Sequence, residues 1–70
     1  MADAPKRAEE AKKALETGKE LATKGDAIGA QAQFQFAYLL DNIAVSAGES
    51  TGETVDAAAA EIAKLTEKDK

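Results

Sequence analysis

The chain has 70 residues, a net charge of −4 and neither cysteine nor histidine. A chain of this length forms a single domain, expected over residues 1–70, whose core supplies roughly 3–5 kcal/mol of net stability. The acidic balance excludes nucleic acid as the expected partner, because neutralising phosphates requires a basic surface. Without histidine or a thiol the chain lacks the commonest general base and metal ligands. We therefore expect no catalytic residue, no metal site, no cofactor and no enzymatic activity.

The chain offers no signal for a membrane or for export. No apolar run approaches the roughly 20 residues that a membrane span needs. Residues 1–7 contain a basic pair without the apolar segment that follows it in a secretory signal. We therefore expect a soluble, cytoplasmic protein with no membrane span.

A first helix is expected over residues 5–24, opening on a proline, which a first helical turn tolerates. Small and apolar residues recur at steps of three and four, the spacing of one helical face. This face comprises Ala8, Ala11, Leu15, Gly18, Leu21 and Ala22. Gly25 is expected to end the helix in the left-handed conformation, and Asp26 to cap the start of the next. A turn this short makes the first two helices antiparallel neighbours.

The second helix, expected over residues 27–47, is apolar on nearly every side, so it must be covered from several directions. One face carries Ala30, Phe34, Ala37 and Tyr38, and the other carries Ile28, Ala32, Phe36, Leu39, Leu40 and Ile43. We expect the first helix to cover one face and the third helix to cover the other. We expect the apolar side chains of these two helices to be too few to cover the second helix around its middle. The predicted partner-binding residues are Phe36, Tyr38, Leu40 and Ile43.

A third helix is expected over residues 51–66, with residues 67–70 frayed. Ser50 and Glu53 have the spacing of a capping box, in which each side chain accepts an N–H of the first turn. A single apolar stripe of Val55, Ala58, Ala59, Ile62 and Leu65 follows. The predicted fold is therefore all-α, a three-helix bundle running up-down-up with the second helix in the centre.

The first hairpin carries the signature of a known helical repeat. Its elements are Gly18, Leu21, the Gly25-Asp26 turn, Ala30, Phe34 and Ala37. Residues 11–42 thereby resemble a single tetratricopeptide repeat, although Ala14 and Thr17 replace that family's usual aromatic and leucine residues. The resemblance implies a helical hairpin of an interaction scaffold. Small residues at any tight helix crossing would give a similar pattern.

A second resemblance concerns the whole chain. The three predicted helices, opening on such a hairpin, are similar to the microtubule-interacting and trafficking domain. The basic, tyrosine-rich third helix of that family is missing from this sequence. We rank this resemblance below the first.

Polar residues interrupt the second helix at Asp41 and Asn42. They can set the register of the helix or contact a partner, or they can occupy its narrow solvent-facing side. We favour the solvent-facing interpretation. Glu49, Glu53 and Asp56 are the only local carboxylates that could form an acidic metal site. Their position at the start of the third helix, where negative charge is favourable, explains them better.

Two functions remain open at the level of sequence. The first is a non-enzymatic module that presents the apolar surface of the second helix to a protein or peptide partner. The alternative is a structural protein that associates with itself as a homodimer through the same helix.

Overall fold

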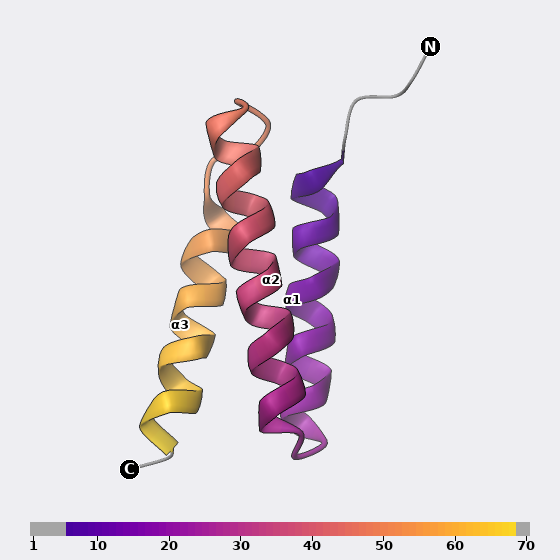
Figure 1. Ribbon diagram of the computed structural model, residues 1–70, viewed down its shortest axis with the longest axis vertical. Coiled ribbons are helices and arrows are strands. Elements are labelled where there is room, and N and C mark those ends of the chain that lie inside the picture. The colour runs from indigo at the N-terminus through magenta and orange to yellow at the C-terminus, as the bar shows by residue number, and fades with distance from the viewer. Residues whose placement is uncertain (1–5, 69–70) are drawn as a thin grey trace.

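The computed structural model describes residues 6–68, which form three helices, each running in the opposite direction to the one before it (Figure 1). Helix α1 spans Arg7–Thr23, α2 spans Ala27–Ser46 and α3 spans Glu53–Lys68. The predicted all-α three-helix bundle is confirmed. The proline expected in the first turn lies outside the described residues, as do residues 69–70.

Two glycine turns end α1 and α2 near the predicted positions. Gly25 has a φ of +89° and Gly48 a φ of +77°, a region that glycine enters without steric cost. After α1, the N–H of Asp26 donates to the carbonyl of Leu21 at 2.9 Å, and the N–H of Gly25 donates to that of Ala22 at 3.1 Å. These paired bonds are the Schellman arrangement, which satisfies carbonyls that the helix itself leaves free. The turns are therefore encoded locally.

The start of α2 follows the sequence prediction. The backbone N–H of Gly29 donates to the Asp26 carboxylate at 2.9 Å, so Asp26 is the N-cap. This bond satisfies one of the first-turn N–H groups that have no partner inside the helix.

The start of α3 differs from the prediction. The helix begins at Glu53 rather than residue 51, and it is still helical at residues 67 and 68, which were expected to fray. The Ser50 hydroxyl accepts from the N–H of Gly52 at 3.1 Å, so the predicted capping box of Ser50 and Glu53 is wrong. The first-turn N–H of Val55 donates instead to Asp41, a residue of α2, at 2.9 Å.

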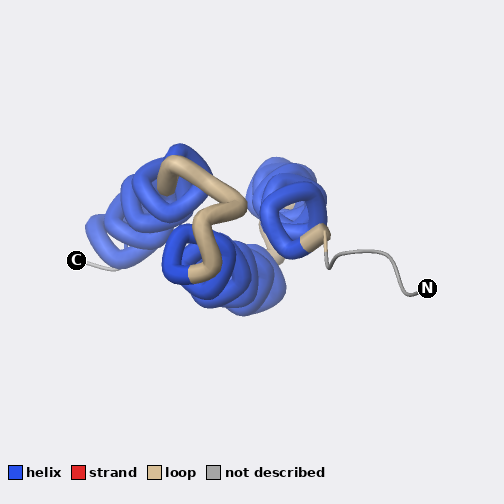
Figure 2. Tube along the Cα trace, turned by 90° about the horizontal axis from the view of Figure 1, so that it is seen from above, coloured by secondary structure: helices blue, strands red, loops and turns tan. Residues whose placement is uncertain are grey.

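Helix α2 is the central element, because it packs against both other helices while α1 and α3 touch each other little. Viewed from above, the three helices form a V with α2 at its apex (Figure 2). Both neighbours therefore lie on the same side of α2. The expectation that α3 would cover the second apolar face of α2 is wrong, and that face is left open.

The core is built mainly from alanine around one aromatic ring. Its buried members are Ala14, Leu15, Ala30, Phe34, Ala37 and Ala58. Phe34 is only 1% exposed. A Cβ placed on Gly18 would lie 2.6 Å from Cε1 of the Phe34 ring, so Gly18 is where α1 admits the ring. The close approach at Gly18 therefore involves the Phe34 ring, and Ala30 is itself fully buried.

We expect Gly18→Ala to destabilise the protein. At an exposed helical site this change stabilises by roughly 0.5–1 kcal/mol. Here the new methyl group meets a buried ring, and overpacking of a core costs about 1–3 kcal/mol. Urea unfolding should show a lower midpoint, whereas Thr17→Ala, at the exposed neighbouring position, should lower the free energy of unfolding by no more than a few tenths of a kcal/mol. A Gly18→Ala protein more stable than wild type would contradict the close contact.

Candidate functional site: the outer face of α2

The outer face of α2 is an apolar stripe that neither neighbouring helix covers. We define it as Ile28, Ala32, Phe36, Leu39, Leu40 and Ile43. These residues share one side because they recur at steps of three and four along the helix. The exposed fraction is 86% for Ile28, 60% for Leu39, 52% for Ile43 and 51% for Phe36. Four large apolar side chains are thus at least half in water.

The outer face carries no charge, although the chain contains nine basic and 13 acidic residues. The only charged residue of α2 is Asp41, and its side chain is fully buried on the other side of the helix. Uncharged polar residues border the stripe, namely Gln31, Gln35, Asn42 and Ser46. The surface is therefore both apolar and electrically neutral along the length of the helix.

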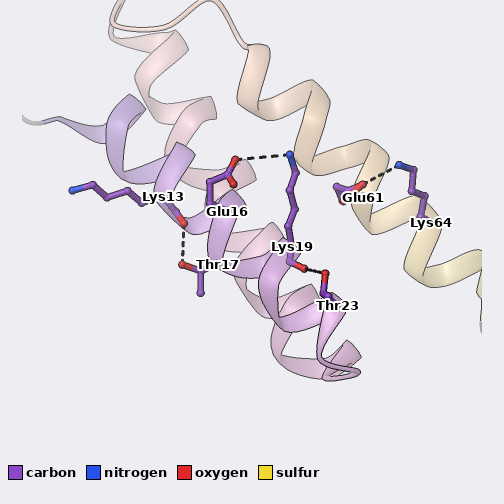
Figure 3. Close-up of polar contacts among 7 residues, drawn as sticks. All are labelled: Lys13, Glu16, Thr17, Lys19, Thr23, Glu61 and Lys64. Atoms are coloured by element: carbon purple, nitrogen blue, oxygen red, sulfur yellow. Dashed lines mark hydrogen bonds and ion pairs between the residues drawn. The ribbon is translucent and has the colours of Figure 1, made fainter.

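Most of the charged residues that the structure describes lie on α1 and α3 instead. Figure 3 shows local pairs within one helix, such as Lys19 with Glu16 at 3.9 Å and Lys64 with Glu61 at 3.0 Å. Exposed pairs of this kind contribute little stability, typically below about 1 kcal/mol. The charged side chains keep the surfaces of α1 and α3 hydrated, whereas the outer face of α2 has none.

Two shallow grooves border the outer face. On the α3 side, a mostly apolar groove of about 400 Å³ is lined by Gln35, Tyr38, Leu39, Ala59 and Ile62. On the α1 side, a groove of about 270 Å³ is lined by Glu10, Lys13, Ala14, Thr17, Gln33 and Phe36. The apolar surface thus continues from α2 onto α3, and it meets charged residues at α1.

The predicted partner-binding residues occupy different positions. Phe36 and Ile43 are exposed on the outer face, and Leu40 is half-buried beside them. Tyr38 is half-buried, packs against the core and lines the α3 groove. Leu39 was not among the predicted site residues, yet it is more exposed than Phe36. Its spacing of three from Phe36 and four from Ile43 is the signal that would have placed it there.

Asp41 and Asn42 have opposite environments. Asn42 is exposed, whereas Asp41 is fully buried, so the solvent-facing interpretation is wrong for Asp41. The Asp41 carboxylate accepts from the Ser50 hydroxyl at 2.6 Å and from the N–H of Val55 at 2.9 Å. Asp41 therefore caps α3 from within α2, and no buried side-chain polar atom among the described residues lacks a partner.

Other kinds of site receive no support within residues 6–68. No group of three or more histidine, cysteine, aspartate or glutamate side chains there is placed to hold a metal ion. None of the three helices combines the length and apolar composition needed to cross a membrane.

The chain matches no protein-family model, no curated protein and no solved structure. The resemblances to a tetratricopeptide repeat and to the microtubule-interacting and trafficking domain therefore stay predictions.

Proposed function

We propose that this protein is a non-enzymatic interaction module that binds a protein or peptide through the outer face of α2. The observation that carries the proposal is the neutral apolar stripe, in which Ile28, Phe36, Leu39 and Ile43 are half or more exposed. Full burial of such a side chain is worth about 1.5–3 kcal/mol relative to full exposure, so each one that is half in water forgoes a substantial part of that energy. Contiguous exposure of this kind marks interaction surfaces in soluble proteins.

The chemistry of the stripe favours an apolar, helical partner. Phe36, Leu39 and Ile43 are spaced as the anchors of a helix that packs against a groove or another helix. The α3 groove beside Leu39 adds an apolar wall, so the binding surface extends over two helices. The resemblance of the first hairpin to an interaction repeat agrees with this class of function.

Photo-crosslinking in cells that express the chain tests this function. Phe36 is replaced by the photoreactive amino acid p-benzoylphenylalanine, which keeps an aromatic ring at the stripe. We expect covalent adducts with another protein or with a second copy. Excess wild-type chain should reduce these adducts, whereas excess Phe36→Glu chain should not.

The matched control carries the same photoreactive group at Glu20, an exposed position of α1. We expect few adducts from that site. Equal adduct yields from positions 20 and 36, or none from position 36, would refute the outer face of α2 as a binding surface.

A further inference from the structure

We propose that the partner on the outer face of α2 is a second copy of this chain, bound antiparallel across a two-fold axis between Phe36 and Leu39. This inference rests on the proposed function, because it names the occupant of the same surface. A two-fold contact uses one patch twice, so the patch must be complementary to itself. Charge, spacing and side-chain size each bear on that requirement.

The charge distribution favours a second copy over a charged partner. Each chain has a net charge of −4, so two copies repel wherever acidic surfaces meet. The outer face of α2 carries no charge, because Asp41, the one charged residue of this helix, is buried on its other side. A different partner selected by charge would need charged residues along this helix, and α2 exposes none.

A coiled-coil seam runs along the outer face and extends beyond it to Gly29 and Ser46. Its residues recur at alternating steps of three and four, in the order Gly29, Ala32, Phe36, Leu39, Ile43 and Ser46. This spacing keeps one side of a helix facing a partner helix. Charged residues beside such a seam usually select the partner. Here the adjoining positions, Ile28, Gln33, Gln35, Leu40 and Asn42, are all uncharged.

The sizes of the side chains select the antiparallel orientation. The seam opens on the small residues Gly29 and Ala32, continues with the large residues Phe36, Leu39 and Ile43, and ends on the small Ser46. Parallel copies would set large residues against each other and leave a gap between the small ones. In the antiparallel pair, Ala32 of each copy faces Ile43 of the other, and Phe36 faces Leu39. Ala32 against Ile43 sets a small side chain against a large one, which favours the close packing that interfaces share with protein interiors, and Phe36 against Leu39 forms the apolar centre of the contact.

The surroundings of α2 can enlarge this contact. A helix of 20 residues is about 30 Å long and about 10 Å wide, so α2 alone falls short of the roughly 800 Å² per partner of a standard interface. The grooves on both sides supply further surface. The antiparallel two-fold sets α1 against α1 of the second copy in the reverse direction.

Sedimentation equilibrium of the purified full chain tests the occupant. We expect wild type to pass from monomer to dimer between micromolar and near-millimolar concentration. Phe36→Glu should weaken association about 100-fold or more, because it places an unpaired charge in the contact. Its helix content should persist, since Phe36 is half exposed in one copy. Gln31→Glu, which adds the same charge to α2 outside the seam, should leave association nearly unchanged.

Disulfide trapping tests the orientation, and the chain has no cysteine to interfere. Ala32→Cys and Ile43→Cys proteins are each oxidised alone and then as a mixture. In the antiparallel pair the two Ala32 positions are 11 residues apart along the helix axis, a distance of about 16 Å, which exceeds the reach of a disulfide. We therefore expect disulfide dimers in the mixture and few in either protein alone. Dimers from each variant alone would overturn the antiparallel orientation.

The outcomes separate this inference from the proposed function. A wild-type chain that stays monomeric at near-millimolar concentration, while position 36 crosslinks to a different protein, overturns the second copy and leaves the interaction module standing. If the Phe36→Glu variant dimerises as strongly as wild type, self-association uses another surface, and the inference is also overturned. Failure of both crosslinking and association refutes the proposed function itself.

Discussion

Phe34→Ala is expected to leave the protein largely unfolded at room temperature. Phe34 is the one large apolar side chain that is almost fully buried, at 1% exposure, among the described residues. Removing a buried phenylalanine ring costs about 3–5 kcal/mol, because burial is lost and a cavity remains. A domain of this size has roughly 3–5 kcal/mol of net stability. The far-ultraviolet circular dichroism of this variant should therefore lose most of its helical signal.

Phe34→Leu serves as the control, because it keeps an apolar side chain that reaches part of the same space. It should remain folded, with a loss of about 1–2 kcal/mol measured by urea unfolding. In that background Gly18→Ala should lose most of its cost, since the ring that the new methyl group would meet is gone. Strict additivity of the two changes would show that Gly18 and Phe34 are not coupled. A folded Phe34→Ala protein would show that the core does not depend on the ring.

Sequence reasoning succeeded where a few neighbouring residues determine the structure. The turns at Gly25 and Gly48 need a positive φ, and the residues that close them lie within five positions along the chain. The Asp26 cap likewise depends on Gly29, three residues later. Local patterns of this kind can be recognised without knowing how the helices pack.

The candidate site was predicted only in part, because exposure on α2 depends on the direction from which its neighbours approach. The apolar pattern placed Phe36 and Ile43 on one face, and they are exposed there. It could not tell that α1 and α3 both pack on the same side of α2, as Figure 2 shows. As a result Leu39 was omitted from the site, whereas Tyr38, which packs on the core, was included.

Asp41 was misjudged for a related reason. A carboxylate in an apolar helix usually faces water, because burying a charge without partners is costly. Its partners, the Ser50 hydroxyl and the N–H of Val55, lie nine and 14 residues further along the chain. Only the fold brings them to Asp41. Such a long-range cap has no short spacing that sequence analysis could recognise.

Asp41→Ala is therefore expected to be the second most damaging single change, at about 3 kcal/mol, since each hydrogen bond to a charged group contributes about 1.5–3 kcal/mol. It removes both acceptors from the start of α3 and leaves the N–H of Val55 without its partner. Because Asp41 is the polar link between α2 and the start of α3, we expect α3 to detach before the α1–α2 hairpin. Amide hydrogen exchange should report loss of protection first at Val55 and then along α3.

Two further variants test whether the damage comes from losing the two carboxylate oxygens of Asp41 or from any substitution in this part of α2. Asp41→Asn keeps one oxygen to accept from Val55, and its NH₂ group can donate to the Ser50 hydroxyl, so it should cost only about 1 kcal/mol. Asn42→Ala, at the exposed neighbouring position, should be neutral or slightly stabilising, because alanine is the better helix former. If Asp41→Ala is no more damaging than Asn42→Ala, the buried carboxylate does not hold α3 in place. If Asp41→Asn is as damaging as Asp41→Ala, the negative charge itself is required, beyond the two hydrogen bonds that an amide can replace.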